Sequence, residues 1–315
     1  MRRLIIVPRR NSTPEYVEDF ETIAQSVRVA APDIEVRVHW DTFESLAAES
    51  KMAPRVPTLT VSIRQLPPGL ALPGRVMACR TISKVEQQAR YKQNWVPSPP
   101  SAPFAWGMQL DPRQWGPFVI IKTLDPDLTS HGGVLWLPTP LLHMLRPENF
   151  AERHWLRIAP SLVQRFVDTG RYPSAFRVLM FLGVPLYAMS ITLRQPRPRL
   201  TGTLDDIIAA NVATNGGART RTMIDDTEIL DFARQASFAL PDVPLQGIDV
   251  IREHGTGKLF ALESNPGGNT WHFSSEHAAA MREQMGDGRK ILLEQFGARD
   301  RAAAALVKSA RAYAA

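Results

Sequence analysis

The sequence has a single cysteine and no hydrophobic run long enough to cross a membrane. With Cys79 alone, no internal disulfide can form, which fits a reducing compartment. The longest apolar stretch, residues 178–189, is interrupted by a glycine and a proline and is too short to span a bilayer. Near the N-terminus, only residues 4–7 are apolar before Pro8, too few for the core of a signal peptide. We therefore expect a cytoplasmic protein without a membrane partner.

The basic part of the chain lacks the aromatic residues on which nucleic-acid bases stack. The 37 Lys and Arg against 31 Asp and Glu give a formal net charge of +6, which alone would suit a nucleic-acid binder. The densest basic stretch contains Arg194, Arg197 and Arg199, with prolines between them and no aromatic side chain. This segment is either a solvated loop or a docking surface for an anionic ligand, and nucleic acid is not a favoured partner.

The remaining composition is typical of a globular protein with a large buried core. Hydrophobic residues make up 44% of the chain and charged residues 22%, which excludes wholesale disorder. The 26 prolines are spread over linkers and do not form one low-complexity tract. A chain of this length is long enough for two or three packed units.

Residues 1–80 are predicted to form an open α/β sheet domain. Short apolar runs alternate with segments of helical spacing, as βαβ units require. Thr13 is expected to cap the first helix, because a threonine before an amphipathic segment is a preferred N-cap. The expected strands and helices, in chain order, are residues 4–7, 14–30, 34–40, 42–50, 58–63 and 75–79.

Two further units are predicted at residues 81–165 and 166–315. Ser83 and Glu86 have the spacing of a capping box that begins a helix. The elements expected after that helix are strands at 118–121 and 134–137, a helix around 159–164, a hairpin of strands 176–181 and 186–193, a hairpin of strands 247–252 and 258–265, and a final helix at 300–314.

The most informative segment is residues 247–265, in which two strand-like runs surround a Gly-Thr-Gly turn. If this hairpin is symmetric about Thr256, Asp249 lies opposite Glu263. Because side chains alternate along a strand, Asn265 shares the face of Glu263. Two carboxylates and an amide oxygen are therefore expected to converge in one small patch.

Such a patch has a chemical consequence, because two carboxylates directly opposite each other in a sheet repel. A cation or a shared proton would remove the repulsion, and three hard oxygen donors suit Mg²⁺ or Mn²⁺ better than zinc. Mg²⁺ would complete its octahedron with water and substrate phosphates. The alternative is an exposed hairpin face on which both acids are solvated. The same symmetry places Ile251 opposite Ala261.

This hairpin, with the sequence "GIDVIREHGTGKLFALESNPGG", resembles the last core motif of ATP-grasp enzymes. In that family an Asp on one strand and a Glu-x-Asn on the next hold the magnesium ions that bridge the ATP phosphates. The resemblance, which covers about residues 75–275, implies metal ligation by Asp249, Glu263 and Asn265 and the use of ATP with Mg²⁺ or Mn²⁺. It also implies an α/β N-terminal domain followed by an α+β ATP-grasp fold of two subdomains.

Other family segments follow in the expected order. Lys84 in "TISKVEQQARY" and Lys122 at the end of "GPFVIIK" correspond to phosphate-binding lysines, and "NVATNGG" is similar to the asparagine and glycines before the last helix. The small subdomain would carry the lysine strand and a phosphate loop, "TSHGG". The residues implied in that loop are Ser130, Gly132 and Gly133.

The segment "LVQRFV" looks like the hinge whose backbone receives adenine, and Arg177 in "SAFRV" matches the arginine that follows the hinge. Where relatives often carry an acid that binds the ribose, this chain has Ala175, and Asp168 is the candidate replacement. A Gln-Arg pair also replaces the usual Gln-Glu. The nucleotide contacts implied at the hinge are Gln164, Arg165, Phe166, Val167 and Asp168.

The resemblance implies an ATP-dependent carboxylate–amine or carboxylate–thiol ligase. A carboxylate would be phosphorylated by ATP, and a nucleophile would displace phosphate to give an amide or a thioester. Arg177 and Lys122 are the expected catalytic residues. The partners would be a small-molecule or peptide carboxylate and an amine acceptor, and a homodimer is left open.

Three other functions remain open: a small-molecule kinase with the same fold, a nucleotide-binding module without turnover, and a nucleic-acid binder. The acceptor pocket is expected between residues 1–80 and the loop 194–221. There Arg219 and Arg221 would meet an acidic substrate or face solvent. His272, which follows the hairpin, either packs in the core or reaches the substrate.

Overall fold

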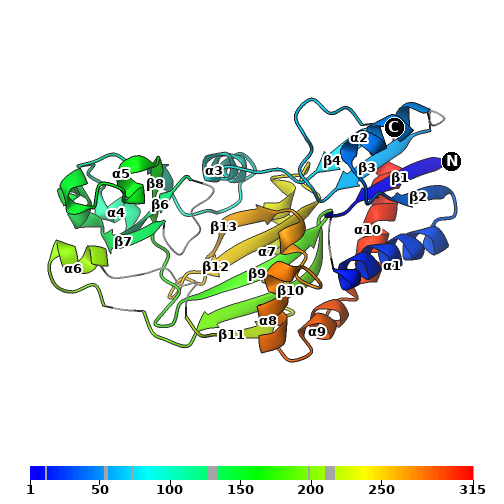
Figure 1. The fold of residues 1–315 in the computed structure, drawn as a ribbon. Helices are drawn as coiled ribbons and strands as arrows, with labels where there is room; N and C mark the ends of the chain where they lie inside the picture. The colour runs from blue at the N-terminus through cyan, green and yellow to red at the C-terminus, as the bar shows by residue number, and fades with distance from the viewer. Residues whose placement is uncertain are drawn as a thin grey trace.

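The computed structural model describes residues 1–10, 13–52, 56–72, 74–125, 133–197, 199–209 and 217–314. Within these ranges the strands form three sheets, and Figure 1 places the five-stranded sheet between the other two. None of the helices in the same ranges has the length and apolar character needed to traverse a bilayer.

The N-terminal sheet is parallel, with strand order β2-β1-β3-β4. Thr13 caps the first helix as predicted, because its hydroxyl accepts a 3.3 Å hydrogen bond from the Tyr16 backbone N–H. The predicted open α/β arrangement of this part is confirmed, with small shifts at the ends of the elements. Their bounds are β1 (Arg2–Val7), α1 (Pro14–Ala30), β2 (Ile34–Val38), α2 (Phe43–Met52), β3 (Thr58–Ser62) and β4 (Arg75–Ala78).

The C-terminal helix returns to this sheet. Helix α10 (Ala298–Tyr313) lies beside α1 and against β1 and β3 (Figure 1). Its buried residues Leu306 and Ala310 share a hydrophobic cluster with Leu4 and Ile23. The two ends of the chain are therefore built into one core. The predicted boundaries after residues 80 and 165 fall between sheets, but the last segment also covers the first sheet.

The central sheet is antiparallel, with strand order β11-β10-β9-β12-β13. Leu182 and Gly183 form the turn between β9 and β10, both with positive φ (50° and 79°), as a two-residue hairpin loop requires. One face packs under α7 through Val178 and Ile248. The bounds are α3 (Lys84–Gln93), β9 (Ser174–Phe181), β10 (Val184–Leu193), β11 (Arg219–Met223), α7 (Thr227–Phe238), β12 (Leu245–Arg252) and β13 (Leu259–Pro266).

The third sheet is antiparallel, with strand order β5-β8-β6-β7. The helix predicted around residues 159–164 is wrong, because residues 161–165 form strand β8. Val163 fills the core beside Ile121, and the backbone of β8 pairs with both β5 and β6. The bounds are β5 (Ser101–Pro103), α4 (Pro112–Trp115), β6 (Phe118–Thr123), β7 (Val134–Pro138), α5 (Trp155–Ile158) and β8 (Ser161–Arg165).

A second correction concerns the loop predicted at residues 194–221. Its last residues begin β11, which pairs with β10 and forms an edge of the central sheet. Arg219 and Arg221 therefore lie on a strand.

The remaining helices are α6 (Leu204–Ala209), α8 (Ala279–Gln284) and α9 (Gly288–Glu294), and the 3₁₀ turns are Thr139–Met144, Pro147–Asn149, Gly268–Thr270 and Glu276–Ala278.

Candidate active site

The hairpin of β12 and β13 has the predicted register at its acidic end. Asp249 lies opposite Glu263, and Gly247 lies opposite Asn265. The Asn265 side-chain nitrogen lies 3.1 Å from Asp249 Oδ2 and 3.4 Å from Glu263 Oε1. The two carboxylates and the amide therefore converge in one patch, as the sequence predicted.

The register differs from the prediction nearer the turn. Val250 pairs with Ala261 and Ile251 with Phe260, so the predicted pairing of Ile251 with Ala261 is wrong. A β-bulge at Leu262 adds one residue to β13, and the turn is closed by the hydrogen bond from Glu253 N to Lys258 O. Residues 255–258 therefore belong to the turn between β12 and β13.

A row of side chains crosses the whole central sheet at the level of the acids. Residues directly opposite each other on neighbouring strands point to the same face. From edge to edge, the row consists of Met223, Met189, Arg177, Asp249 and Glu263. The sheet therefore brings Arg177, the predicted catalytic arginine, to the two predicted metal ligands.

Arg177 and Asp249 form an ion pair with two hydrogen bonds, one of which joins Nη2 to Oδ2 at 2.6 Å. Their side chains are only 21% and 15% exposed. Burial raises the pKa of Asp249 and the charge of Glu263 adds to that shift, while the Arg177 guanidinium acts in the opposite direction. The patch thus holds two acids and one cation with little solvent around them.

Lys122 faces this patch from the third sheet. Its half-buried ammonium lies on β6 and donates a 2.8 Å hydrogen bond to Gln164 Oε1 on β8. Burial lowers the pKa of Lys122, and the neighbouring charge of Lys84 lowers it further, whereas the charges of Glu263 and Asp249 raise it. Lys122 therefore interacts electrostatically with Lys84, the other predicted phosphate-binding lysine, and with both acids.

Lys84 is the first residue of α3. Ser83 caps this helix by accepting a 3.1 Å hydrogen bond from the Glu86 backbone N–H, but the Glu86 carboxylate pairs with Arg80 at 2.7 Å. Only the serine half of the predicted capping box therefore forms. Unpaired N–H groups at the start of a helix favour anions. A phosphate near Lys84 would therefore be stabilised by these N–H groups and by the lysine charge.

An apolar cluster, called the apolar floor below, continues the site along the same face of the central sheet. Val167, Ile251 and Phe260 form a buried cluster, against which Ala175 and Leu262 pack. Ile251 and Ala175 each lie two residues from a member of the polar row, so they point to the same side. Ala175 is thus part of this apolar floor, and the bulge brings Leu262 to it.

The predicted hinge residues take different roles. Gln164 binds Lys122, Val167 belongs to the apolar floor, and Phe166 packs against the rings of Phe118 and Trp136. Asp168 is 60% exposed, and its carboxylate accepts a 2.9 Å hydrogen bond from Gly170 N.

Arg165, the last residue of β8, bridges the hinge to the β12–β13 turn. It forms a 2.9 Å ion pair with Glu253, and its guanidinium lies 5.1 Å from the ring centroid of Phe260. Arg165 is therefore occupied by protein contacts at the edge of the apolar floor.

The predicted phosphate loop is described only at its end. Gly133 is buried, and its carbonyl accepts a 2.9 Å hydrogen bond from Thr123 N. Ser130 and Gly132 lie outside the described residues, as do residues 211–216 of "NVATNGG".

Tyr187 and His272 form a buried pair that interacts electrostatically with Arg177. Tyr187 Oη is hydrogen-bonded to His272 Nδ1, and the rings stack with centroids 5.9 Å apart. Burial lowers the pKa of His272 to about 3, aided by the charges of Arg177, His277, Arg282 and Arg221. His272 is therefore neutral at physiological pH. The sequence indicates His272 by its position directly after the hairpin, whereas Tyr187 lies in an apolar strand that carries no such signal.

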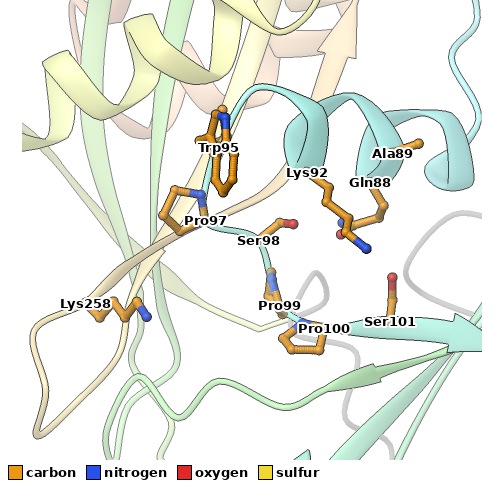
Figure 2. Close-up of a pocket in the computed structure, with 11 residues that line it drawn as sticks. Gln88, Ala89, Lys92, Trp95, Pro97, Ser98, Pro99, Pro100, Ser101 and Lys258 are labelled. Carbon is orange, nitrogen blue, oxygen red and sulfur yellow. The ribbon is translucent and has the colours of Figure 1, made fainter.

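A separate pocket of about 610 Å³ lies between α3 and the proline-rich linker at residues 95–101 (Figure 2). None of the predicted site residues lines it. The linker is anchored to both neighbouring sheets, because Pro97 O accepts from Ala261 N and Pro100 O from Arg165 N. The lining residues are Gln88, Ala89, Lys92, Trp95, Val96, Pro97, Ser98, Pro99, Pro100, Ser101 and Lys258.

No protein-family model matches the sequence, and no curated protein matches it. The structure is similar to the ATP-grasp ligase PsnB complexed with a precursor variant, Mg and ADP (13% identity, 97% of each chain covered, TM-score 0.49). It is also similar to the D-cycloserine synthetase DcsG (16% identity, 98% of this chain and 99% of the other, TM-score 0.48). A third similar structure is the macrocyclase MdnC bound with the precursor peptide MdnA from Microcystis aeruginosa MRC (12% identity, 98% and 100% covered, TM-score 0.49). Each of these three alignments covers at least 97% of this chain.

Proposed function

We propose that this chain is an ATP-dependent carboxylate–amine (or carboxylate–thiol) ligase of the ATP-grasp type, acting in the cytoplasm. One observation carries the proposal: Asp249, Glu263 and Asn265 share one patch, and the charge of Lys122 interacts with both acids and with Lys84. Neighbouring acids and lysines in half-buried positions are a suitable arrangement for a metal–triphosphate complex, which carries charges of both signs.

The donor set fits a hard divalent cation such as Mg²⁺ or Mn²⁺. Two carboxylates and an amide supply oxygen only, and the remaining coordination positions would belong to water and phosphate oxygens. Asn265 donates its amide nitrogen to both acids in this structure, so its oxygen must turn toward the patch to join them. When bound, the ion would supply charge neutralisation for the phosphate oxygens.

The nucleotide would extend from the lysines over the apolar floor. Lys122 and Lys84 would hold phosphate oxygens, together with the backbone N–H groups of the loop that contains Gly133. The ring of the base would rest on Val167 and Phe260, which are buried on the same face of the sheet. The backbone of the hinge, residues 164–168, lies next to this floor and would select the base.

The proposed reaction has two steps. A carboxylate oxygen attacks the γ-phosphorus of ATP, the bond between the γ-phosphorus and the bridging oxygen breaks, and ADP leaves. An amine or thiol then attacks the acyl carbon and loses a proton, the bond to the phosphate oxygen breaks, and phosphate leaves. The protein contributes position and charge: Arg177 and Lys122 would donate hydrogen bonds to the oxygens on which negative charge develops.

The metal ligands provide the direct test. Calorimetry should detect Mg²⁺-dependent ATP binding by the wild type, and Glu263→Gln and Asn265→Ala should each weaken it at least about 10-fold. Glu276→Gln, at an exposed acid outside the site, is the matched control and should bind normally. Wild-type affinity in both site variants would remove the metal assignment.

The outcome of turnover separates the ligase from the other candidates. ADP release that requires both a carboxylate and an amine or thiol supports the ligase. A stable phosphorylated product that forms without the second acceptor identifies a kinase, and tight Mg·ATP binding without ADP release across the panel identifies a binding module.

A further inference from the structure

The face of the central sheet that carries the site is divided by charge. The acids, Asp249 and Glu263, lie on β12 and β13. On the other side of this face, Arg177 lies on β9, and Arg219 and Arg221 lie on β11. Arg221 points to the same face as Arg177, because it lies opposite Ile191, which lies opposite Ala175, two residues from Arg177.

The chain that follows β13 adds cations to the basic half. Arg282 on α8 donates to the carbonyl oxygens of His272 (2.7 Å) and Ser275 (2.9 Å). The charges of Arg177, Arg221, Arg282 and His277 all act on the buried imidazole of His272. Three arginines from separate elements, Arg177, Arg221 and Arg282, therefore all act on the imidazole of His272.

Arg221 is fixed in place without being neutralised. Its Nη1 donates a 2.7 Å hydrogen bond to Gln284 Oε1 on α8, which is an uncharged partner. In the described ranges, neither Arg221 nor Arg282 forms an ion pair, whereas Arg289 and Arg299 nearby are paired with Glu18 and Asp19. Burial lowers the pKa of Arg221, and the charge of Arg219 lowers it further. An anion at this point would offset both effects.

The strand geometry sets the distance between the two arginines. Arg221 lies on the second strand from that of Arg177. Along the strand direction, it lies level with Ala175, two residues from Arg177. With a strand spacing of about 4.8 Å and a rise of about 3.4 Å per residue, the two Cα atoms are about 12 Å apart. Two long guanidinium side chains can therefore hold two acid groups of one small molecule that are separated by several bonds.

We propose that the carboxylate substrate is itself a diacid: its reacting carboxylate lies at Arg177, and a second acid group is bound by Arg221. The inference rests on the proposed function and narrows its substrate class to molecules with two acid groups, such as acidic amino acids. Arg221 selects the substrate by a charge-assisted hydrogen bond that a neutral side chain does not replace. An uncharged isostere leaves the cations of this half uncompensated and binds weakly.

Glutarate and its monoamide are a matched pair of probes, since they differ by one negative charge and hardly in shape. Calorimetry with the Mg·ADP-loaded protein should give at least about 10-fold tighter binding of glutarate, the effect of one charge-assisted hydrogen bond. In Arg221→Gln this preference should fall to about 2-fold or less, and Arg221→Lys should keep part of it. Arg194→Gln, at an exposed arginine bound to Thr220, removes the same charge and should keep the full preference.

The measurements distinguish failure of the diacid proposal from failure of the proposed function. Equal affinity of the wild type for both probes, no binding of glutarate, or an unchanged preference in Arg221→Gln overturns the diacid proposal while Mg·ADP binding stands. Loss of Mg-dependent nucleotide binding by the wild type overturns the proposed function instead. Thermal unfolding of each variant checks the fold, and Arg221→Lys provides the answer if Arg221→Gln does not fold.

Discussion

Arg177 and Asp249 lie directly opposite each other on β9 and β12, and the guanidinium binds both carboxylate oxygens. The positive charge beside Asp249 is therefore supplied by the protein itself. A metal ion bound by Asp249 and Glu263 would add to this charge and take over part of the Arg177 interaction. Arg177 would then be free to meet a substrate anion, so the ion pair connects metal binding with substrate binding.

Replacement of Arg177 tests this connection. Arg177→Ala leaves two acids close together in a half-buried patch, which should cost about 3–5 kcal/mol of unfolding free energy in the presence of EDTA. Added Mg²⁺ should restore a larger part of the stability in this variant than it adds to the wild type, since it replaces the missing charge. Urea unfolding with EDTA and with Mg²⁺ measures both values.

The control for that experiment is Arg252→Ala, which removes a surface arginine paired with Asp226 and Glu228. It should cost at most about 1 kcal/mol, with no added response to Mg²⁺. An Arg177→Ala protein that responds to Mg²⁺ no more than the wild type would contradict a metal site at Asp249 and Glu263.

Lys122 and Lys308 provide a second comparison, because the charge of Lys122 interacts with the acids of the site, whereas Lys308 is exposed on α10. Lys122→Met should weaken Mg·ATP binding about 10- to 100-fold through the loss of a charge-assisted phosphate contact. Lys308→Met should leave the affinity unchanged. Titration calorimetry measures both, and an effect at Lys308 as large as that at Lys122 would exclude the proposed nucleotide position.

The features that the sequence predicted well depend on local signals. Thr13 and Ser83 cap helices through contacts three residues away, which any amphipathic segment with such a start repeats. The pairing of Asp249 with Glu263 was predicted from a hairpin symmetric about Thr256; the residues next to the turn pair one position out of that register, and the bulge at Leu262 restores it. These parts of the fold and of the site are decided within about twenty neighbouring residues.

The wrong predictions, and the features that no prediction covered, concern residues whose conformation depends on partners distant in the sequence. Five residues, 161–165, do not define a hydrophobic period, and their pairing with β6 and β5 determines that they form a strand. The bulge at Leu262 is equally invisible, because the sequence around it fits either register. The contact of Tyr187 with His272 joins segments 85 residues apart, and no local pattern specifies such a pair.

His272 predicts a pH dependence of stability. Its pKa is about 3 in the folded protein, against 6.5 for an unperturbed histidine, so the unfolded chain binds the proton more readily. The contribution of the neutral imidazole is therefore fully present above pH 6.5 and is lost as the pH falls from 6.5 toward 3, at about 1.4 kcal/mol per pH unit at most. His272→Asn should lack this loss.

The free energy of unfolding of the wild type and of His272→Asn, measured between pH 7.5 and 4.5 (chosen to lie on both sides of the unfolded pKa), tests this. The wild type should be the more stable protein at the upper end, and its advantage should shrink as the pH falls. Two parallel curves would mean that folding leaves the pKa of this imidazole unchanged, contrary to its burial among cations.

Gly247 on β12 lies beside Thr270 and the aliphatic part of the Arg177 side chain. A Cβ atom at this position would lie 3.3 Å from Thr270 Cγ2, which would have to shift by a few tenths of an ångström, and 3.5 Å from Arg177 Cδ, which is an ordinary van der Waals contact. Gly247→Ala should therefore cost about 1–3 kcal/mol of stability through Thr270 and leave the Arg177 guanidinium in place. Gly217→Ala, where the nearest atom is the end of the flexible Leu193 side chain at 3.4 Å, is the matched control and should cost less. In the ADP-release assay, Gly247→Ala should keep kcat and KM for ATP within about 2-fold of the wild-type values. A large loss of kcat in this variant would mean that the extra methyl group moves Arg177, contrary to the contact distance.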